Sequence, residues 1–102
     1  MGRRKVLWSI RAREDLFDIY DYLRGEGSPR AALDFVTRIE NRCEEIAEFP
    51  RSGRSRPDIR SSLRIMPFET VVIAYDVVGD QVSIAQIVHG RRDVEALLRD
   101  ED

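Results

Sequence analysis

Arginine is the residue type whose number and spacing in this sequence most clearly suggest a chemical role. Residues 51–64 hold five arginines against a single acidic residue, Asp58, so the segment has a net charge of +4: Arg51, Arg54, Arg56, Arg60 and Arg64. The planar guanidinium group pairs with carboxylates and phosphates and stacks on aromatic rings. The segment therefore suggests a docking surface for an acidic polypeptide or for nucleic acid. A solvated loop that keeps the protein dispersed explains the same charges equally well.

The single histidine, His89, follows an apolar segment and precedes Gly90, Arg91 and Arg92. An unperturbed imidazole titrates near neutral pH, which suits general acid–base catalysis. The alternative is a histidine at a strand end that hydrogen bonds to the backbone or orders the two arginines. We favour this alternative because acid–base catalysis needs a positioned partner, which the sequence does not reveal.

The other reactive residue types point to structural roles. The single cysteine, Cys43, stands on an apolar helical stripe, which favours a small core residue over a nucleophile. One histidine and one cysteine, far apart, cannot supply a zinc site. Gly25 and Gly27 lack the rest of a phosphate-binding glycine motif. We therefore expect no metal and no cofactor.

The composition describes one small domain that spans residues 1–102, with 42% hydrophobic and 35% charged residues. The formal net charge of -2 argues against a protein that coats nucleic acid, and we expect no sequence-specific nucleic-acid binding by the chain alone. That total hides an uneven distribution of charge along the chain, because residues 14–26 and 93–102 each carry a net charge of −4. No apolar run approaches the roughly 20 residues that span a bilayer. We expect a cytoplasmic protein with no membrane contact.

Two amphipathic helices are predicted ahead of the arginine-rich segment. Ser9 is placed to cap the first helix and Gly25–Gly27 to end it, whereas Ser28–Pro29 begins the second and Pro50 ends it. The short break between them predicts an antiparallel helical hairpin. Apolar residues recur at helical spacing in both. They are Ala12, Leu16, Ile19, Tyr20 and Leu23 in the first helix, and Ala32, Phe35, Ile39, Cys43, Ile46 and Phe49 in the second.

The first helix also carries side chains that its apolar stripe does not account for. Three carboxylates recur at every third position and are expected on a solvated face: Asp15, Asp18 and Asp21. Phe17 and Tyr20, with Trp8 ahead of the helix, give more aromatic surface than a narrow stripe needs. That surplus favours a partner that packs on them, although a core position is the simpler assignment for each one singly.

The predicted strands lie at both ends of the chain. Residues 5–10 predict the first strand, and residues 62–68, 70–78 and 81–88 predict three more after a loop at 50–60. A short C-terminal helix follows, with Val94, Leu97 and Leu98 as its apolar positions. The order indicates an α+β fold, with an antiparallel helical hairpin packed on a mainly antiparallel sheet. The N-terminal strand belongs to that sheet, and the three C-terminal strands complete it. The other face of the sheet is left for the C-terminal tail or for another chain.

This order and three local motifs resemble the ParE/RelE superfamily of bacterial type II toxins, over about residues 5–98. The first motif is Ala12–Leu16 with Ile19 and Tyr22, and the second is Phe49–Gly53 after the helical hairpin. The third is Ile84–Asp93, whose His-Gly-x-Arg-Asp ending is similar to the ParE branch.

The resemblance implies one of two activities. RelE-like toxins cut mRNA on the ribosome, whereas ParE-like toxins poison DNA gyrase and are neutralised by a ParD-like antitoxin in a hetero-oligomer. RelE-like toxins use basic residues on the central strands and a tyrosine or histidine near the C-terminus. Here Gln86 stands where many relatives carry arginine, and no tyrosine follows Tyr75. We therefore favour a gyrase-binding toxin without a catalytic residue. The alternatives are a ribosome-dependent mRNA endonuclease and a non-toxic remnant that still binds antitoxin.

Two groups of contact residues follow from these hypotheses. We expect the target to be contacted by Arg64, His89, Arg91 and Arg92. We expect the antitoxin to be contacted by Arg51, Arg54, Arg56, Arg60, Phe17 and Tyr20.

Overall fold

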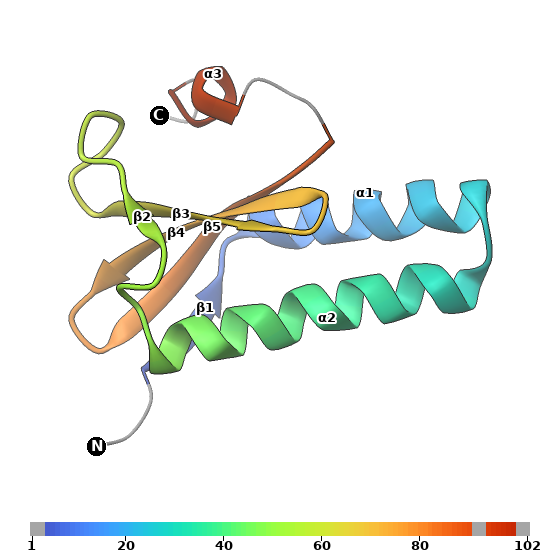
Figure 1. Ribbon diagram of the computed structural model, residues 1–102, viewed down its shortest axis with the longest axis horizontal. Coiled ribbons are helices and arrows are strands. Elements are labelled where there is room, and N and C mark those ends of the chain that lie inside the picture. Colours follow the sequence, from blue (N-terminus) through green and yellow to red (C-terminus); the bar gives the residue numbers. More distant parts are fainter. Residues whose placement is uncertain (1–3, 91–93, 100–102) are drawn as a thin grey trace.

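The structure is a computed structural model that describes residues 4–90 and 94–99. Its elements are, in chain order, β1 (Lys5–Trp8), α1 (Ile10–Glu26), α2 (Pro29–Glu48), β2 (Arg54–Ser55), β3 (Leu63–Phe68), β4 (Val71–Val78), β5 (Gln81–His89) and α3 (Val94–Arg99). The strands form one sheet in the order β1-β5-β4-β3-β2, in which β1 pairs parallel to β5 and the other neighbours pair antiparallel. The predicted α+β fold with a mainly antiparallel sheet is confirmed (Figure 1).

Local capping signals set the two long helices where the sequence predicts them. The Ser9 hydroxyl accepts a hydrogen bond from the Ala12 N–H at 2.9 Å and donates one to the Ala85 carbonyl at 2.8 Å, which ties the start of α1 to β5. The Ser28 hydroxyl accepts from the Ala31 N–H at 3.1 Å, with Pro29 as the first residue of α2. These caps satisfy N–H groups that the helices themselves leave unpaired. The two helices form the predicted hairpin (Figure 1).

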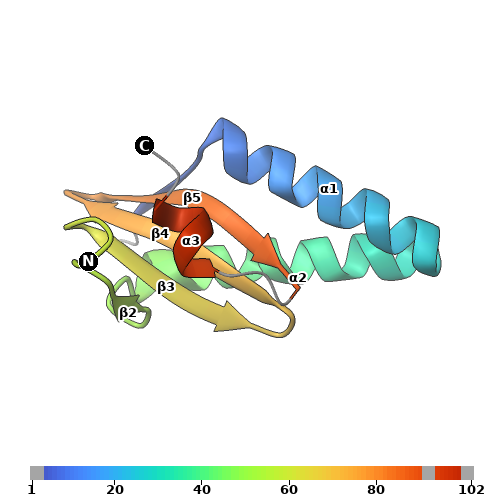
Figure 2. The same ribbon diagram turned by 90° about the horizontal axis from the view of Figure 1, so that it is seen from above.

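The two faces of the sheet are covered very differently. Against α1 and α2 lies the large core, where Ile39, Ile73 and Tyr75 are completely buried. The short helix α3 lies over the opposite face, as Figure 2 shows from above. There Leu98 packs with Leu63 and Ala74. Of the two covers that the sequence left open for this face, the C-terminal helix is the one observed.

Two predictions for the segment that follows the helical hairpin are wrong. Phe49, expected on the apolar stripe of the second helix, is 67% exposed, because α2 ends at Glu48 and Phe49 caps it with a non-helical φ of -130°. Ala47 is buried in that last turn instead. The expected loop at 50–60 contains the two-residue strand β2, which is too short to show a periodic pattern.

The first strand is also shorter than predicted. It ends at Trp8, and Ile10, which begins α1, is 78% exposed. Among the described residues, neither the long helices nor α3 has the length and hydropathy to span a bilayer.

Candidate functional site

A buried tyrosine holds the turn at which the arginine-rich segment begins. The Tyr75 hydroxyl donates a hydrogen bond to the Pro50 carbonyl and accepts one from the Gly53 N–H, both at 2.8 Å. A Cβ at position 53 would collide with that hydroxyl, so the turn requires glycine. Burial raises the pKa of Tyr75, which keeps its hydroxyl protonated as a donor. The start of the segment is thus fixed to the central strand β4.

Arg56 belongs to an ion-pair network that joins the segment to α3. Its guanidinium donates to both carboxylate oxygens of Asp58 at 3.0 and 2.8 Å and lies 3.5 Å from the Glu95 carboxylate. Arg99 on α3 closes the network with contacts of 3.1 Å to Asp58 and 3.0 Å to Glu95. The hydrogen bonds from Arg56 lower the pKa of Asp58 to about 2.

Arg60 and Arg64 are engaged with groups of the sheet and the turn. The Arg60 guanidinium donates to both carboxylate oxygens of Asp76 on β4, at 3.2 and 2.8 Å. Arg64 on β3 donates to the Gly53 carbonyl at 2.7 Å. Both side chains therefore stabilise the loop against the strands.

Arg51 and Arg54 differ from the other three arginines. Both are exposed, and neither side chain makes an ion pair or hydrogen bond with the described part of the chain. The positive charge that the sequence assigns to residues 51–64 is therefore offset by carboxylates only at Arg56, by Asp58 and Glu95, and at Arg60, by Asp76. Local composition cannot reveal this pairing, because Asp76 and Glu95 lie in distant elements.

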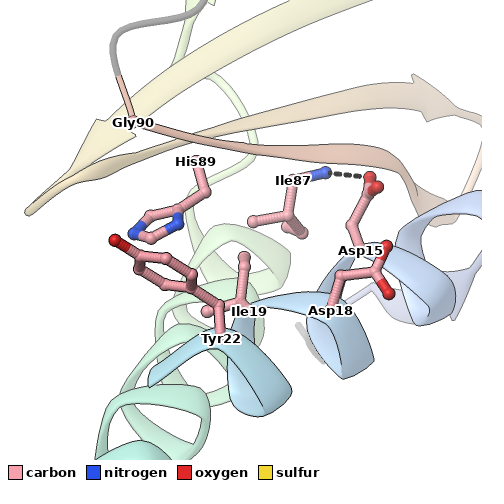
Figure 3. A pocket seen from close by; sticks show the side chains of 7 residues that line it. All are labelled: Asp15, Asp18, Ile19, Tyr22, Ile87, His89 and Gly90. Carbon is pink, nitrogen blue, oxygen red and sulfur yellow. Dashed lines mark hydrogen bonds between the residues drawn. The ribbon is translucent and has the colours of Figure 1, made fainter. Parts of the chain in front are cut away.

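His89 ends β5 and lies within a small group of aromatic rings. Its ring lies beside that of Tyr22 (Figure 3), with 5.9 Å between the ring centroids and an interplanar angle of 66°. Its centroid is also 6.3 Å from that of Phe35. It borders a pocket of about 410 Å³, which is lined by Asp15, Asp18, Ile19, Tyr22, Ile87, His89 and Gly90. The chain therefore places its single histidine beside aromatic and carboxylate groups.

Asp15 contributes to this pocket as a fixed group, which corrects the prediction that it lies on a solvated face. Its side chain is 15% exposed, and one carboxylate oxygen accepts a hydrogen bond from the Ile87 N–H at 2.9 Å. The other oxygen pairs with Arg11 at 3.1 Å. Asp18 and Asp21 are exposed, as the helical spacing predicts.

The two described target-contact candidates are not brought together. Arg64 pairs with Tyr75, whereas His89 pairs with Val71 at the other end of β4. Tyr75 follows Val71 by four positions, so the two candidates are about 13 Å apart along the strand direction. Gln86 lies between them on β5 and is 1% exposed. Arg91 and Arg92 lie outside the described residues.

The two aromatic candidates on α1 differ in exposure. Phe17 is 68% exposed and is open to a partner. Tyr20 is partly buried, and the Arg24 guanidinium lies 5.9 Å from its ring centroid. Ile10, which the sequence placed in a strand, lies seven residues before Phe17 and therefore on the same side of α1. The sequence signal that Ile10 belongs to the helix was its position directly after the cap Ser9.

The remaining reactive groups behave as structural ones. Cys43 is completely buried, as predicted, and burial raises its pKa to about 12. Within residues 4–90 and 94–99, no three side chains of His, Cys, Asp or Glu come close enough to hold a metal ion.

Comparison with known protein families identifies the family of this chain. Residues 6–94 match the family model described as ParE toxin of type II toxin-antitoxin system, parDE. The chain belongs to the ParE toxin family. It is therefore a toxin of the type II toxin–antitoxin class.

Curated relatives of this family cover almost the whole chain. Toxin RelE2 of Caulobacter vibrioides is 35% identical over 86% of this chain and 97% of its own length. Toxin ParE3 of the same organism is 35% identical over 96% of each chain. A solved structure titled "Chromosomal ParDE TA system from P. aeruginosa" superposes with a TM-score of 0.76 at 23% identity, covering 87% of this chain and 98% of that one. That likeness confirms the fold.

Proposed function

We propose that this chain acts by binding: it inhibits DNA gyrase, blocks replication, and is neutralised by a ParD-like antitoxin in a hetero-oligomer. The observation that carries the proposal is membership of the ParE toxin family over residues 6–94. Relatives named ParE3 and ParE1 support it, because they match most of the chain at 35% and 30% identity. No cofactor is needed for such an activity.

The placement of the basic side chains supports binding rather than RNA cleavage. Cleavage by attack of a ribose 2′-hydroxyl needs a base, an acid and cations near the developing phosphorane charge. Arg64 is hydrogen bonded to a carbonyl of the turn, and His89 lies about 13 Å away along the strand. Gln86 supplies no charge at its buried position.

A ribosome-dependent mRNA endonuclease is the second candidate. It is favoured by the name RelE2 of a relative with 35% identity, and by the exposed surroundings of His89 beside Tyr22. In that case His89 would be the acid or base, and His89→Ala would abolish cleavage.

Pulse labelling after induced expression separates these functions. In bacteria that express the chain without an antitoxin, we expect thymidine incorporation to fall first, while methionine incorporation continues and the cells filament. If methionine incorporation stops first, the ribosome is the target. If neither falls while folded protein accumulates, the chain is a non-toxic remnant. Ile73→Asp places a charge in the core and serves as the unfolded control.

The antitoxin surface is tested separately by charge reversal. Arg51→Glu with Arg54→Glu changes the two loop arginines whose side chains are unengaged within the described residues, and we expect it to weaken antitoxin binding. Arg30→Glu, an exposed arginine at the start of α2, is the matched control. Equal antitoxin binding and toxicity in both variants would remove the basic loop from the interface.

A further inference from the structure

Arg38 shows how this molecule holds a guanidinium group between an aromatic ring and a carboxylate. Arg38 lies 5.3 Å above the ring centroid of Phe35 and donates two hydrogen bonds of 2.9 Å to the carboxylate of Glu69. The aromatic face and the carboxylate together match both the flat surface and the fork of an arginine side chain.

The pocket beside His89 offers the same pair of groups. Tyr22 and Asp18 stand four residues apart on α1, and therefore on one side of the helix. Tyr22 is 57% exposed, and the rings of Tyr22 and His89 pack edge to face. Asp18 makes no ion pair or hydrogen bond with the described residues, and no arginine or lysine among them lines the pocket.

The pocket has its aromatic rings and its carboxylates at opposite ends. This arrangement fits a long side chain with an apolar stem and a cationic end. Figure 3 shows the Tyr22 and His89 rings on one side and the Asp15 and Asp18 carboxylates on the other, with isoleucine side chains between them. Apolar walls suit the methylene stem of an arginine, while the carboxylates suit its charged end. The bonds to Ile87 and Arg11 hold Asp15 in place as a second negative group.

A second hollow adjoins this pocket and could hold the residue next to the arginine. It is lined by Leu23, Phe35 and Thr70, with Glu26 and Glu69 also at its wall. Phe35 contacts the His89 ring, and the Gly90 N–H donates to the Thr70 carbonyl at 3.1 Å, so the two hollows adjoin. An apolar side chain next to the arginine would fill the second hollow.

We propose that the pocket formed by Asp18, Tyr22 and His89 binds an arginine side chain of a partner polypeptide, which lies across the Tyr22 ring and pairs its guanidinium with Asp18. The surface is acidic and aromatic, unlike the basic segment at 51–64. The two surfaces would thus receive partner segments of opposite charge. The assignment stands on the pocket and does not require gyrase to be the target.

The test is a titration of the full-length ¹⁵N-labelled protein with the peptide acetyl-Leu-Arg-Leu-amide, followed by amide chemical shifts. We expect saturable shifts at Ile87, His89 and Gly90. The same peptide with citrulline, the neutral isostere of arginine, should bind about three- to tenfold more weakly. Asp18→Asn and Tyr22→Leu should weaken arginine-peptide binding by a similar factor.

Asp21→Asn is the matched control, since Asp21 lies on the same helix, is exposed, and pairs with Arg24 outside the pocket. It should leave binding unchanged, and an unaltered spectrum confirms that each variant is folded. Equal binding of the citrulline peptide, or no saturable binding, would overturn the proposal. Binding that emerges only in an Arg91→Gln/Arg92→Gln variant would also overturn it, because the pocket would then serve the chain's own arginines.

Discussion

The two faces of the sheet bury side chains of the same type by different means. On one face the helices α1 and α2 enclose a large continuous core around Ile39 and Ile73. On the other face the six residues of α3 hold Leu98 over Leu63 and Ala74, aided by exposed ion pairs. Exposed ion pairs contribute little to stability. The comparison teaches that complete burial of a residue does not show how much of the fold depends on it.

Gln86 makes the second face weaker still. Its side-chain amide is buried, and neither its Nε2 nor its Oε1 has a hydrogen-bond partner among the described residues. It pairs with Ala74 in the sheet, and therefore lies on the side that α3 covers. A buried amide without partners costs free energy, which opposes the closure of this face.

The largest effect is expected from truncation in the large core. Ile73 is completely buried, and Ile73→Ala should lower the free energy of unfolding by about 3–4 kcal/mol through lost burial and a cavity. Urea denaturation followed by circular dichroism measures this. A loss below about 1 kcal/mol would mean that this core can collapse around the vacancy.

The matched truncation on the other face should cost less. Leu98 is 2% exposed, but α3 can detach while the rest of the fold stays intact, so Leu98→Ala should cost about 1–2 kcal/mol. Native-state hydrogen exchange should show the loss in α3 alone.

Cys43 gives an independent readout of that difference. It is buried in the large core with its pKa raised to about 12, so thiol labelling at pH 8 should await global opening. Labelling should accelerate in Ile73→Ala and stay slow in Leu98→Ala. Equal acceleration in both variants would show that the two faces open as one unit.

Removing the unpaired amide should stabilise the protein. Gln86→Leu keeps a similar volume without the unmet hydrogen-bonding groups, and we expect a gain of about 1 kcal/mol. Gln81→Leu, at the less buried start of the same strand, is the control and should change stability little. A loss of stability in Gln86→Leu alone would mean that the amide does find partners in solution.

The smallest effect is expected when the pH is lowered. Arg56 lowers the pKa of Asp58 from 3.8 to about 2, so the pairing favours the folded state above pH 4. Because the folded pKa lies below the unfolded one, that contribution is lost as pH falls from about 4 to 2. Exchange of the α3 amides should increase over this range relative to those of α2. Asp58→Asn should flatten the difference, and an unchanged difference would remove Asp58 from α3 docking.

Local signals predicted the framework of the fold. Ser9, and Ser28 followed by Pro29, act through the next three residues, so the helix starts could be found from the sequence. Phe49 was misplaced because apolar spacing does not reveal where a helix ends. Asp15 was misplaced because its partner Ile87 is 72 residues away.

The candidate site was less predictable than the fold. Arg60 looked available because its partner Asp76 belongs to another element, and the second partner of Arg56, Glu95, does so too. The pocket beside His89 likewise joins the side chains of α1 to the end of β5, and no local pattern connects these segments. Residues that a single helix or turn brings together can be found from the sequence, whereas sites built across elements need the sheet register.

The most direct test of the proposed function uses purified, folded protein with purified gyrase and relaxed plasmid. Binding to gyrase predicts inhibited supercoiling and an accumulation of gyrase-cleaved DNA, both suppressed by a ParD-like antitoxin, with Ile73→Asp inactive. Full supercoiling at a molar excess of the folded chain, together with cleavage of mRNA in a ribosome assay, would contradict it.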